Sequence, residues 1–322
     1  MIIQIGLLIL GFVLLIKGAD IFVDASVGIA EKLHVPKVII GLTIVAMGTS
    51  APEVVISVTA AMRGNNALAI SNVVGSNMFN LIFIIGLCAV IKPIMVKVGE
   101  IAKDFWLSIV AAALLLAMKF IGGDIIPWWG SLMFLVIFGT YMFLIIKKAL
   151  KAKHEEEAHL AAHPEDAPPE VKIRKMPVLA LFAVLGCALI VAGGHLAVEG
   201  ATYVATALGV SERIIGLTII AMGTSLPELI TSLVACKRGE NEFALGNIIG
   251  SNIFNILFIL GIAGLIAPLE FELALMFDTS VLVVSSLVAL FFVYTRKTLG
   301  RIEGSVMVIF YVSYIAFVVF SQ

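Results

Sequence analysis

Two glutamates occupy matching positions inside long apolar runs of the chain. Glu53 ends the segment AMGTSAPE and Glu228 ends the segment AMGTSLPE, and neither residues 41–61 nor residues 216–235 contain a lysine or arginine. A carboxylate near the middle of a bilayer is energetically costly, so it marks a functional site by default. A protonated or structurally paired glutamate is the alternative. The symmetric placement favours function, because it would bring both carboxylates to one axis.

The residues before each glutamate supply further oxygen ligands. Pro52 and Pro227 lack an N–H, and their rings crowd the carbonyl four residues earlier, so each proline breaks its helix. We expect this to release backbone carbonyls, those of Ala46, Met47, Gly48, Ala221, Met222 and Gly223, beside the hydroxyls of Thr49, Ser50, Thr224 and Ser225. The alternative is a simple kink in which the hydroxyls bond back to their own helix.

A second motif, GSNMFN at 75–80 and GSNIFN at 250–255, follows each glutamate segment. The spacing of four residues puts Ser76 with Asn80, and Ser251 with Asn255, on one helical face. We expect these four side chains to point at the site, although bonds that hold helices together would explain them too. For the remaining amides, Asn72, Asn77, Asn247 and Asn252, helix–helix hydrogen bonds are the preferred interpretation.

These candidate ligands are all oxygen atoms, which suits a hard cation. Calcium accepts six to eight oxygens in flexible geometry, whereas zinc and copper favour histidine or cysteine. Two glutamates balance one divalent ion or two monovalent ions. One pocket that holds either species in turn, never both, meets the physical requirement for coupled counter-transport.

The elements that position these residues are membrane helices. The chain has 322 residues, of which 61% are hydrophobic and 13% charged, with a mean hydropathy of +1.12. These values exclude a soluble globular protein, and a net charge of −1 gives no basic surface for nucleic acid. Apolar runs of about 20 residues predict ten transmembrane helices, near 3–30, 37–61, 67–91, 104–120, 127–146, 177–206, 213–235, 243–266, 275–294 and 303–321. The first is expected to be retained as a span, and the first and sixth are long enough to be tilted.

An internal repeat organises these helices. Shifting the chain by 175 residues aligns 41–80 with 216–255 without a gap, with 23 of 40 positions identical. A repeat of five spans is odd in number, so the second copy starts on the opposite side of the membrane. The sequence therefore predicts an all-α polytopic membrane protein of two inverted five-helix repeats, 1–150 and 177–322.

The loop charges predict the orientation. Cytoplasmic loops carry the excess of lysine and arginine, and alternate loops hold 17 of these residues on one side against 3 on the other. We expect a multi-pass protein of the cell membrane with both termini outside. Residues 151–176 form the linker between the repeats, and its charged part, 151–175, is predicted to be cytoplasmic. Its three histidines are interpreted as solvated.

At the paired GTSxPE and GSNxFN motifs the chain resembles the calcium/cation antiporter superfamily, and in particular prokaryotic sodium/calcium exchangers. The resemblance covers nearly the whole chain. It implies a central calcium site from Thr49, Glu53, Thr224 and Glu228, with sodium sites from Ala46, Ser50, Ser76, Ala221, Ser225 and Ser251. It also implies alternating access by sliding of the long first and sixth helices. Several exchangers carry aspartate where this chain has Asn255, so potassium dependence is not expected.

Exchange of Ca2+ for Na+ is the preferred function, and a proton/calcium antiporter that uses the same glutamates is the alternative. An intramembrane enzyme is disfavoured because HExxH and GxSxG are absent from the sequence. We expect no cofactor and no obligatory protein partner. The expected partners are the transported Ca2+ and Na+ ions and the lipid bilayer. Asp20, Asp24, His195 and Glu199 are expected near the outer surface, as solvated interface residues.

Overall fold

The computed structural model describes residues 2–95, 98–163, 174–210, 219, 221–296 and 298–321 of an all-helical chain. Among these residues, eight helices are long and apolar enough to cross a membrane, and one further pair of helices passes the same test with a bend of 50°. The predicted spans match the observed helices to within a few residues at most ends. The start of the seventh predicted helix, near 213, lies outside the described residues.

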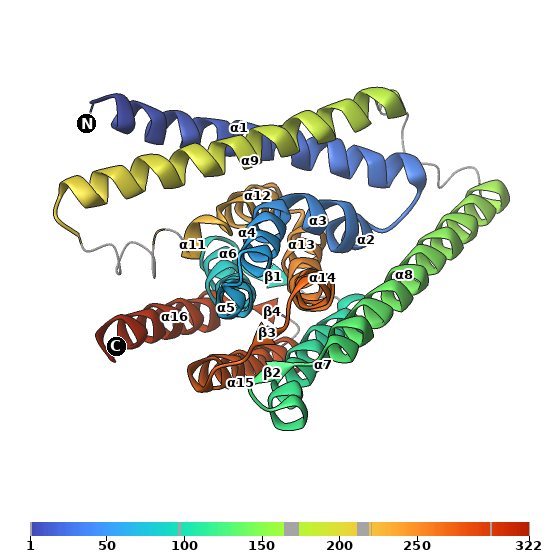
Figure 1. The fold of residues 1–322 in the computed structure, drawn as a ribbon. Coiled ribbons are helices and arrows are strands. Elements are labelled where there is room, and N and C mark those ends of the chain that lie inside the picture. Colours follow the sequence, from blue (N-terminus) through green and yellow to red (C-terminus); the bar gives the residue numbers. More distant parts are fainter. Residues whose placement is uncertain are drawn as a thin grey trace.

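Six long helices are continuous. They are α1 (Ile2–Leu33), α7 (Val98–Gly122), α8 (Trp128–Ala162), α9 (Met176–Ala207), α15 (Leu273–Arg296) and α16 (Arg301–Ser321). They frame the molecule, with α1 and α9 across one face of the bundle and α7, α15 and α16 toward the opposite face (Figure 1).

The helices between these layers are interrupted. The first half contains α2 (Lys37–Ile40), η1 (Gly41–Val45), α3 (Ala46–Thr49), α4 (Ala51–Met62), α5 (Asn66–Met78), η2 (Phe79–Ile84) and α6 (Ile85–Ile91). The second half contains α11 (Ala221–Gly223), α12 (Leu226–Arg238), α13 (Asn241–Ile253), η5 (Phe254–Ile259) and α14 (Leu260–Ile266). The α5–α6 and α13–α14 spans are the most buried of the candidate membrane spans, so the core lies along them.

Two short strand pairs tie the halves together. β1 (Ile94–Met95) pairs antiparallel with β4 (Thr298–Leu299), and β2 (Ile125–Ile126) pairs antiparallel with β3 (Leu269–Glu270). Each pair joins a strand of the first half to one of the second half. The halves are therefore bonded to each other at connections as well as through the core.

Helices α1 and α9 lie side by side along most of their length (Figure 1). Glycines allow this approach, because a Cβ added at Gly11 would lie 2.5 Å from the Ala197 amide nitrogen, and one at Gly193 would lie 2.7 Å from the Gly11 carbonyl. Such small-residue contacts let membrane helices pack backbone to backbone. Helices α1 and α9 thus form one paired layer over the core.

Helix α8 is longer than the helix predicted near 127–146. It continues through Ala162, so the linker segment 151–162 is helical, and His163 caps it. The sequence favours this, because alanine, lysine and glutamate are strong helix formers. Lys151 and Lys153 also pair with Glu155 and Glu157 one turn later, at 3.4 and 3.7 Å.

The expectation that Asp20, Asp24, His195 and Glu199 all lie near the outer surface is wrong. Helices α1 and α9 run in opposite directions (Figure 1), so residues near the end of α1 lie away from residues near the end of α9. Asp20 and Asp24 contact Arg238 at the end of α12, whereas His195 and Glu199 contact each other on α9 at 3.9 Å.

The glycine contacts predict a stability difference between two substitutions. Gly193→Val should destabilise the protein by about 1–3 kcal/mol, because the new side chain would overlap the α1 backbone. Gly6→Val on α1 is the matched control, since a Cβ at Gly6 meets no atom within 4 Å. Thermal unfolding in detergent measures the effect, and equal melting temperatures for the two variants would contradict this account of the α1–α9 pair.

Candidate cation site

Two buried carboxylates accept hydrogen bonds from the opposite half of the chain. The Ser50 hydroxyl donates to Glu228 Oε1 at 2.7 Å, and the Ser225 hydroxyl donates to Glu53 Oε1 at 2.9 Å. All four side chains are fully buried. The predicted meeting of Glu53 and Glu228 at one site is therefore present in the geometry.

The helix breaks position these four residues. Ser50 and Ser225 lie between helices, with φ and ψ of −82° and 11°, and −90° and 8°. A proline follows in the first turn of α4 and of α12, where a missing N–H is tolerated. Each glutamate then falls in the first turn of its helix, where the positive end of the helix dipole favours a negative group.

The serines of the second motif complete the arrangement around each carboxylate. Ser76 donates to Glu53 Oε1, and Ser251 donates to Glu228 Oε1, each at 3.4 Å. Each Oε1 atom thus faces two hydroxyls, one from its own half and one from the other. The predicted inward face of Ser76 and Ser251 agrees with these contacts.

Several buried oxygens at the site have no hydrogen-bond partner among the described residues. They are Glu53 Oε2, Glu228 Oε2, Asn80 Oδ1, Asn255 Oδ1 and Thr224 Oγ1. Unpaired polar atoms are costly inside a protein, so a buried cluster of them calls for a ligand. The free carboxylate oxygens and the Thr224 hydroxyl are ligands of the kind that a hard cation accepts. Both polar atoms of the Asn80 amide are unpartnered, so the amide can offer either its oxygen or its nitrogen. No group of three or more histidine, cysteine or acidic side chains able to hold a metal occurs in the described ranges.

The two threonines differ. Thr49 donates to its own helix at the Val45 carbonyl, 3.1 Å away, and lies 3.1 Å from Asn247 Oδ1. The Val45 contact fits the back-bonding alternative and the Asn247 contact reaches the other half, so the predicted role of Thr49 as a ligand stays a prediction. Among the described residues the Thr224 hydroxyl has no hydrogen-bond partner, and its predicted role as a ligand also stays a prediction.

The predicted release of backbone carbonyls is incomplete. The Ala46 carbonyl still accepts the Ser50 N–H at 3.0 Å, so it is not freed by Pro52. It is also 3.5 Å from the Ser251 hydroxyl, and a carbonyl oxygen has two lone pairs. The Gly48 carbonyl accepts a bond from the Cys187 thiol at 3.5 Å. The side chain of Ala221 lies outside the described residues.

The remaining asparagines make hydrogen bonds between helices, as predicted, and Asn77 and Asn252 make them across the halves. Asn77 Nδ2 donates to the Asn252 carbonyl at 3.0 Å, and Asn252 Nδ2 donates to the Asn77 carbonyl at 3.3 Å. Asn255 Nδ2 donates to Asn77 Oδ1 at 3.1 Å. This exchange holds α5 against α13 directly beside the carboxylates.

Sequence reasoning missed two supporting serines and the local helix geometry. Ser57 and Ser232 follow the glutamates by four residues and are fully buried. They accept hydrogen bonds from Asn72 and Asn247, both at 3.0 Å. The spacing of four was a usable signal. The wide π-helical turns at 41–45, 79–84 and 254–259 carry no sequence signal that predicts them. Such turns are frequent at functional sites.

Comparisons with known proteins agree on the relatives of this chain. The family model for sodium/calcium exchanger proteins matches residues 3–147 and 178–320. CaxA of Alkalimonas amylolytica is 38% identical over 312 residues, 95% of each chain. The sodium/calcium exchanger MaX1 of Methanosarcina acetivorans is 34% identical over 338 residues, 96% of each chain. The solved sodium–calcium exchanger NCX_Mj, soaked with Na+ and Sr2+, superposes with a TM-score of 0.82 at 31% identity and 98% coverage of both chains.

The asparagine exchange predicts a coupled loss of stability. Asn77→Ala should cost about 1–3 kcal/mol, because it leaves the Asn252 carbonyl and the Asn255 amide without their partner. The double variant with Asn255→Ala should cost less than the sum of the single changes, because both changes remove the same bond between Asn255 Nδ2 and Asn77 Oδ1. Chemical unfolding in detergent tests this, with exposed Asn65→Ala as control. Strict additivity would rule out the shared network.

Proposed function

Since the chain belongs to the sodium/calcium exchanger family, we propose that it exchanges Ca2+ for Na+ at the single oxygen-lined cage around Glu53 and Glu228. The chain is a multi-pass membrane transporter, a cation/Ca2+ antiporter and not an enzyme. The choice of Na+ as counter-ion, the ligands and the orientation in the membrane are the proposed parts.

The reciprocal serine–glutamate bonds carry the proposal. Because Ser50 bonds Glu228 and Ser225 bonds Glu53, both carboxylates belong to one cage. Together they provide two formal negative charges, enough for one divalent ion or two monovalent ions. Calcium and sodium would then exclude each other, which couples their movements.

The proposed ligand set includes both halves. Glu53 and Glu228 are shared by all ions, with their unpartnered Oε2 atoms turned to the cation. The other proposed ligands are Ala46, Thr49, Ser50, Ser76, Asn80, Ala221, Thr224, Ser225, Ser251 and Asn255. Support comes from the buried, unpartnered oxygens of Thr224, Asn80 and Asn255. The Thr49 hydroxyl and the serine hydroxyls donate hydrogen bonds, and each oxygen keeps lone pairs that can accept a cation.

We further propose ten spans in two inverted repeats, with residues 1–150 and 177–322 as the halves and 151–176 between them. The hydrogen bonds support this symmetry, because Ser50→Glu228 becomes Ser225→Glu53 under a shift of 175 residues. The strands support it as well, since the same shift carries β1 onto β3. The charge bias of the loops places both termini outside and the linker in the cytoplasm.

Proton/calcium exchange is the competing function, because carboxylates can also release Ca2+ by taking protons. The serine hydroxyls that line the cage favour sodium. The two possibilities separate in proteoliposomes loaded with calcium, where an imposed sodium gradient at constant pH should drive calcium flux. Flux that ignores sodium and follows an imposed pH gradient would replace our proposal with the proton mechanism.

Replacing either cage glutamate should abolish exchange. Glu53→Gln or Glu228→Gln keeps the side-chain shape but removes one of two charges, so we expect calcium flux to fall by about 100-fold or more. Glu157→Gln, an exposed residue of the α8 extension, should keep normal flux. Elution of each variant at the volume of the parent protein checks the fold. Normal flux in both cage variants would remove the site from the mechanism.

Electrical recording fixes the exchange ratio. If three sodium ions exchange for one calcium ion, one net charge crosses per cycle, worth about 2.3 kcal/mol per 100 mV. The cage contains two carboxylates and amides at both asparagine positions, so we expect the electrically silent ratio of two sodium ions. The measurement is current during sodium-driven calcium flux in planar bilayers, and a current proportional to the flux would contradict the silent ratio.

A further inference from the structure

Arg238, the last residue of α12, forms ion pairs with two aspartates of α1. Its Nη2 lies 2.8 Å from Asp20 Oδ1, and its Nη1 contacts Asp24 one turn further along α1. The guanidinium thus bridges two turns of a helix from the paired α1–α9 layer. Arg238 belongs to the core, so these ion pairs connect the layer to the core on the side of the linker.

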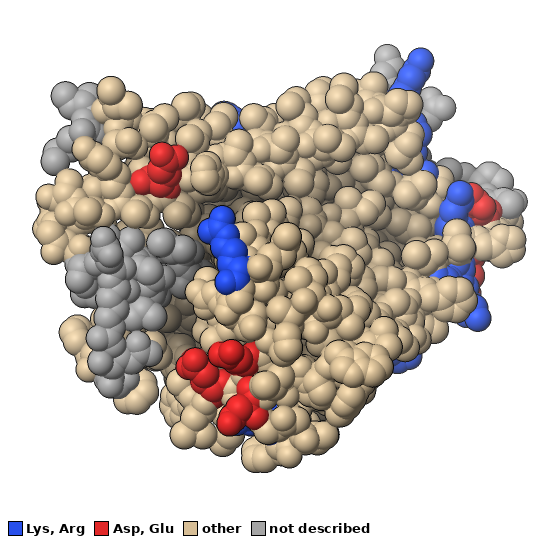
Figure 2. Space-filling view, viewed as in Figure 1, with Lys and Arg blue, Asp and Glu red and all other residues tan. Residues whose placement is uncertain are grey.

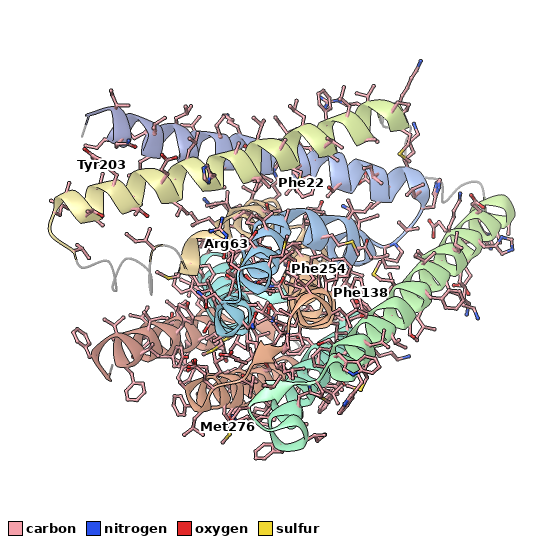
Figure 3. All side chains as sticks on the ribbon, in the orientation of Figure 1. Phe22, Arg63, Phe138, Tyr203, Phe254 and Met276 are labelled. Atoms are coloured by element: carbon pink, nitrogen blue, oxygen red, sulfur yellow. The ribbon has the colours of Figure 1, made fainter. Side chains whose placement is uncertain are left out.

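The same positions in the other half make different contacts. A shift of 175 residues carries Arg238 onto Arg63, and the two aspartates onto His195 and Glu199. Within the described part of the chain Arg63 makes no ion pair, and His195 and Glu199 contact each other at 3.9 Å. A hollow separates a basic group on the core from an acidic group on α9 (Figure 2), and Arg63 is labelled on the core side of α9 in Figure 3.

Helix packing differs between the sides in the same way. Helix α1 lies against α12, where the ion pairs are made. A cavity of about 300 Å³ separates α9 from α4 and reaches Thr224 of the cage. Val55, which lines this cavity, is 64% exposed, whereas its repeat counterpart Ile230 is half-buried. A cavity of about 440 Å³ also lies beside Asp24 and Arg238, but its lining residues include none of the cage. Of these two cavities, only the one on the side of the unpaired arginine reaches a cage residue.

We propose that Arg238 and Arg63 form two ion-pair locks that close in alternation. The proposal rests on the proposed exchange by alternating access. In the state observed, Arg238 holds Asp20 and Asp24 and closes the linker side. When the α1–α9 layer moves to the opposite position, the ion pairs of Arg238 break. Arg63 then pairs with Glu199, which closes the α4–α9 side. These are positioning residues, because none of them contacts the cage.

The strength of such pairs suits this role. Ion pairs between partly exposed side chains are weak, so each lock biases the equilibrium without trapping one state. The two locks are also unequal, since Arg238 meets two carboxylates whereas Arg63 would meet one carboxylate beside a histidine. The bias therefore favours the state in which the linker side is closed, as the structure has it.

Cysteine labelling tests the alternation. In a chain whose three native cysteines are replaced by serine, Val55→Cys reports the α4–α9 side and Ile230→Cys reports the linker side. A membrane-impermeant maleimide is applied to sealed vesicles of known orientation, from the side each reporter faces. Arg238→Gln should lower the labelling rate at position 55 by about threefold and raise it at position 230, because loss of the pairs shifts the population. Arg63→Gln should do the reverse.

Matched variants make the test specific. Lys237→Gln removes the neighbouring positive charge without touching the lock and should label like the parent. Arg238→Asp combined with Asp24→Arg rebuilds the pair in reverse and should restore the parent rates. Each variant is compared only after elution at the parent volume. The proposal is overturned if Arg238→Gln labels like Lys237→Gln, if the two arginine variants shift the reporters in the same direction, or if the reversed pair restores nothing.

Labelling and transport can fail separately. The labelling rates need no transported ion, so they report the locks even if the parent chain shows no sodium-driven calcium flux. Absent flux with reciprocal labelling shifts would refute sodium/calcium exchange and keep the locks. Normal flux with unshifted labelling would keep the exchange and refute the locks.

Discussion

The structure depends on the burial of two carboxylates in an apolar bundle where neither finds a basic partner among the described residues. Each carboxylate is satisfied at one oxygen by a serine of the opposite half. A buried charge left without such partners would be far costlier than the helix distortions needed to bring the serines there. Neither half can meet this requirement alone. The two halves share a sequence repeat, yet each supplies a hydrogen-bond donor to the carboxylate of the other, and the cross-half strand pairs and the asparagine exchange add to this link.

The same requirement accounts for the irregular backbone at the centre. An unbroken helix would place Ser50 and Glu53 less than one turn apart, with the serine hydroxyl free to bond its own helix. The break before Ala51 turns Ser50 out of both helices and aims it at the other half. Irregular backbone at membrane depth is tolerated when it is buried in protein, and α1 with α9 covers the breaks (Figure 1).

Much of this arrangement was predictable from sequence, and the reasons for the remainder are physical. The apolar runs and the 175-residue repeat predict the helices and bring Glu53 to Glu228, because composition and symmetry act over long stretches. The contact of Thr49 with Asn247 of the other half depends on local packing, and the motif alone cannot reveal it. The polar composition of 151–162 favours a linker, whereas its alanines and ion pairs favour the helix that forms. Asp20 and Asp24 lie away from His195 and Glu199 because α1 and α9 run in opposite directions (Figure 1), which sequence position along a helix does not reveal.

The proposed locks lie outside the cage for a physical reason. If one group both bound the ion and closed the path to it, each opening would break its bond to the ion. The energy barrier to opening would then rise with the affinity for the ion. Ion pairs at Arg238 are partly exposed, so water can replace the lost contacts when they open. Affinity then depends on the buried carboxylates and access on exposed charges. The halves can differ at the locks, as Asp20 and His195 do, while the cage residues Glu53 and Glu228 stay matched, because an unequal lock changes only which side is open more often.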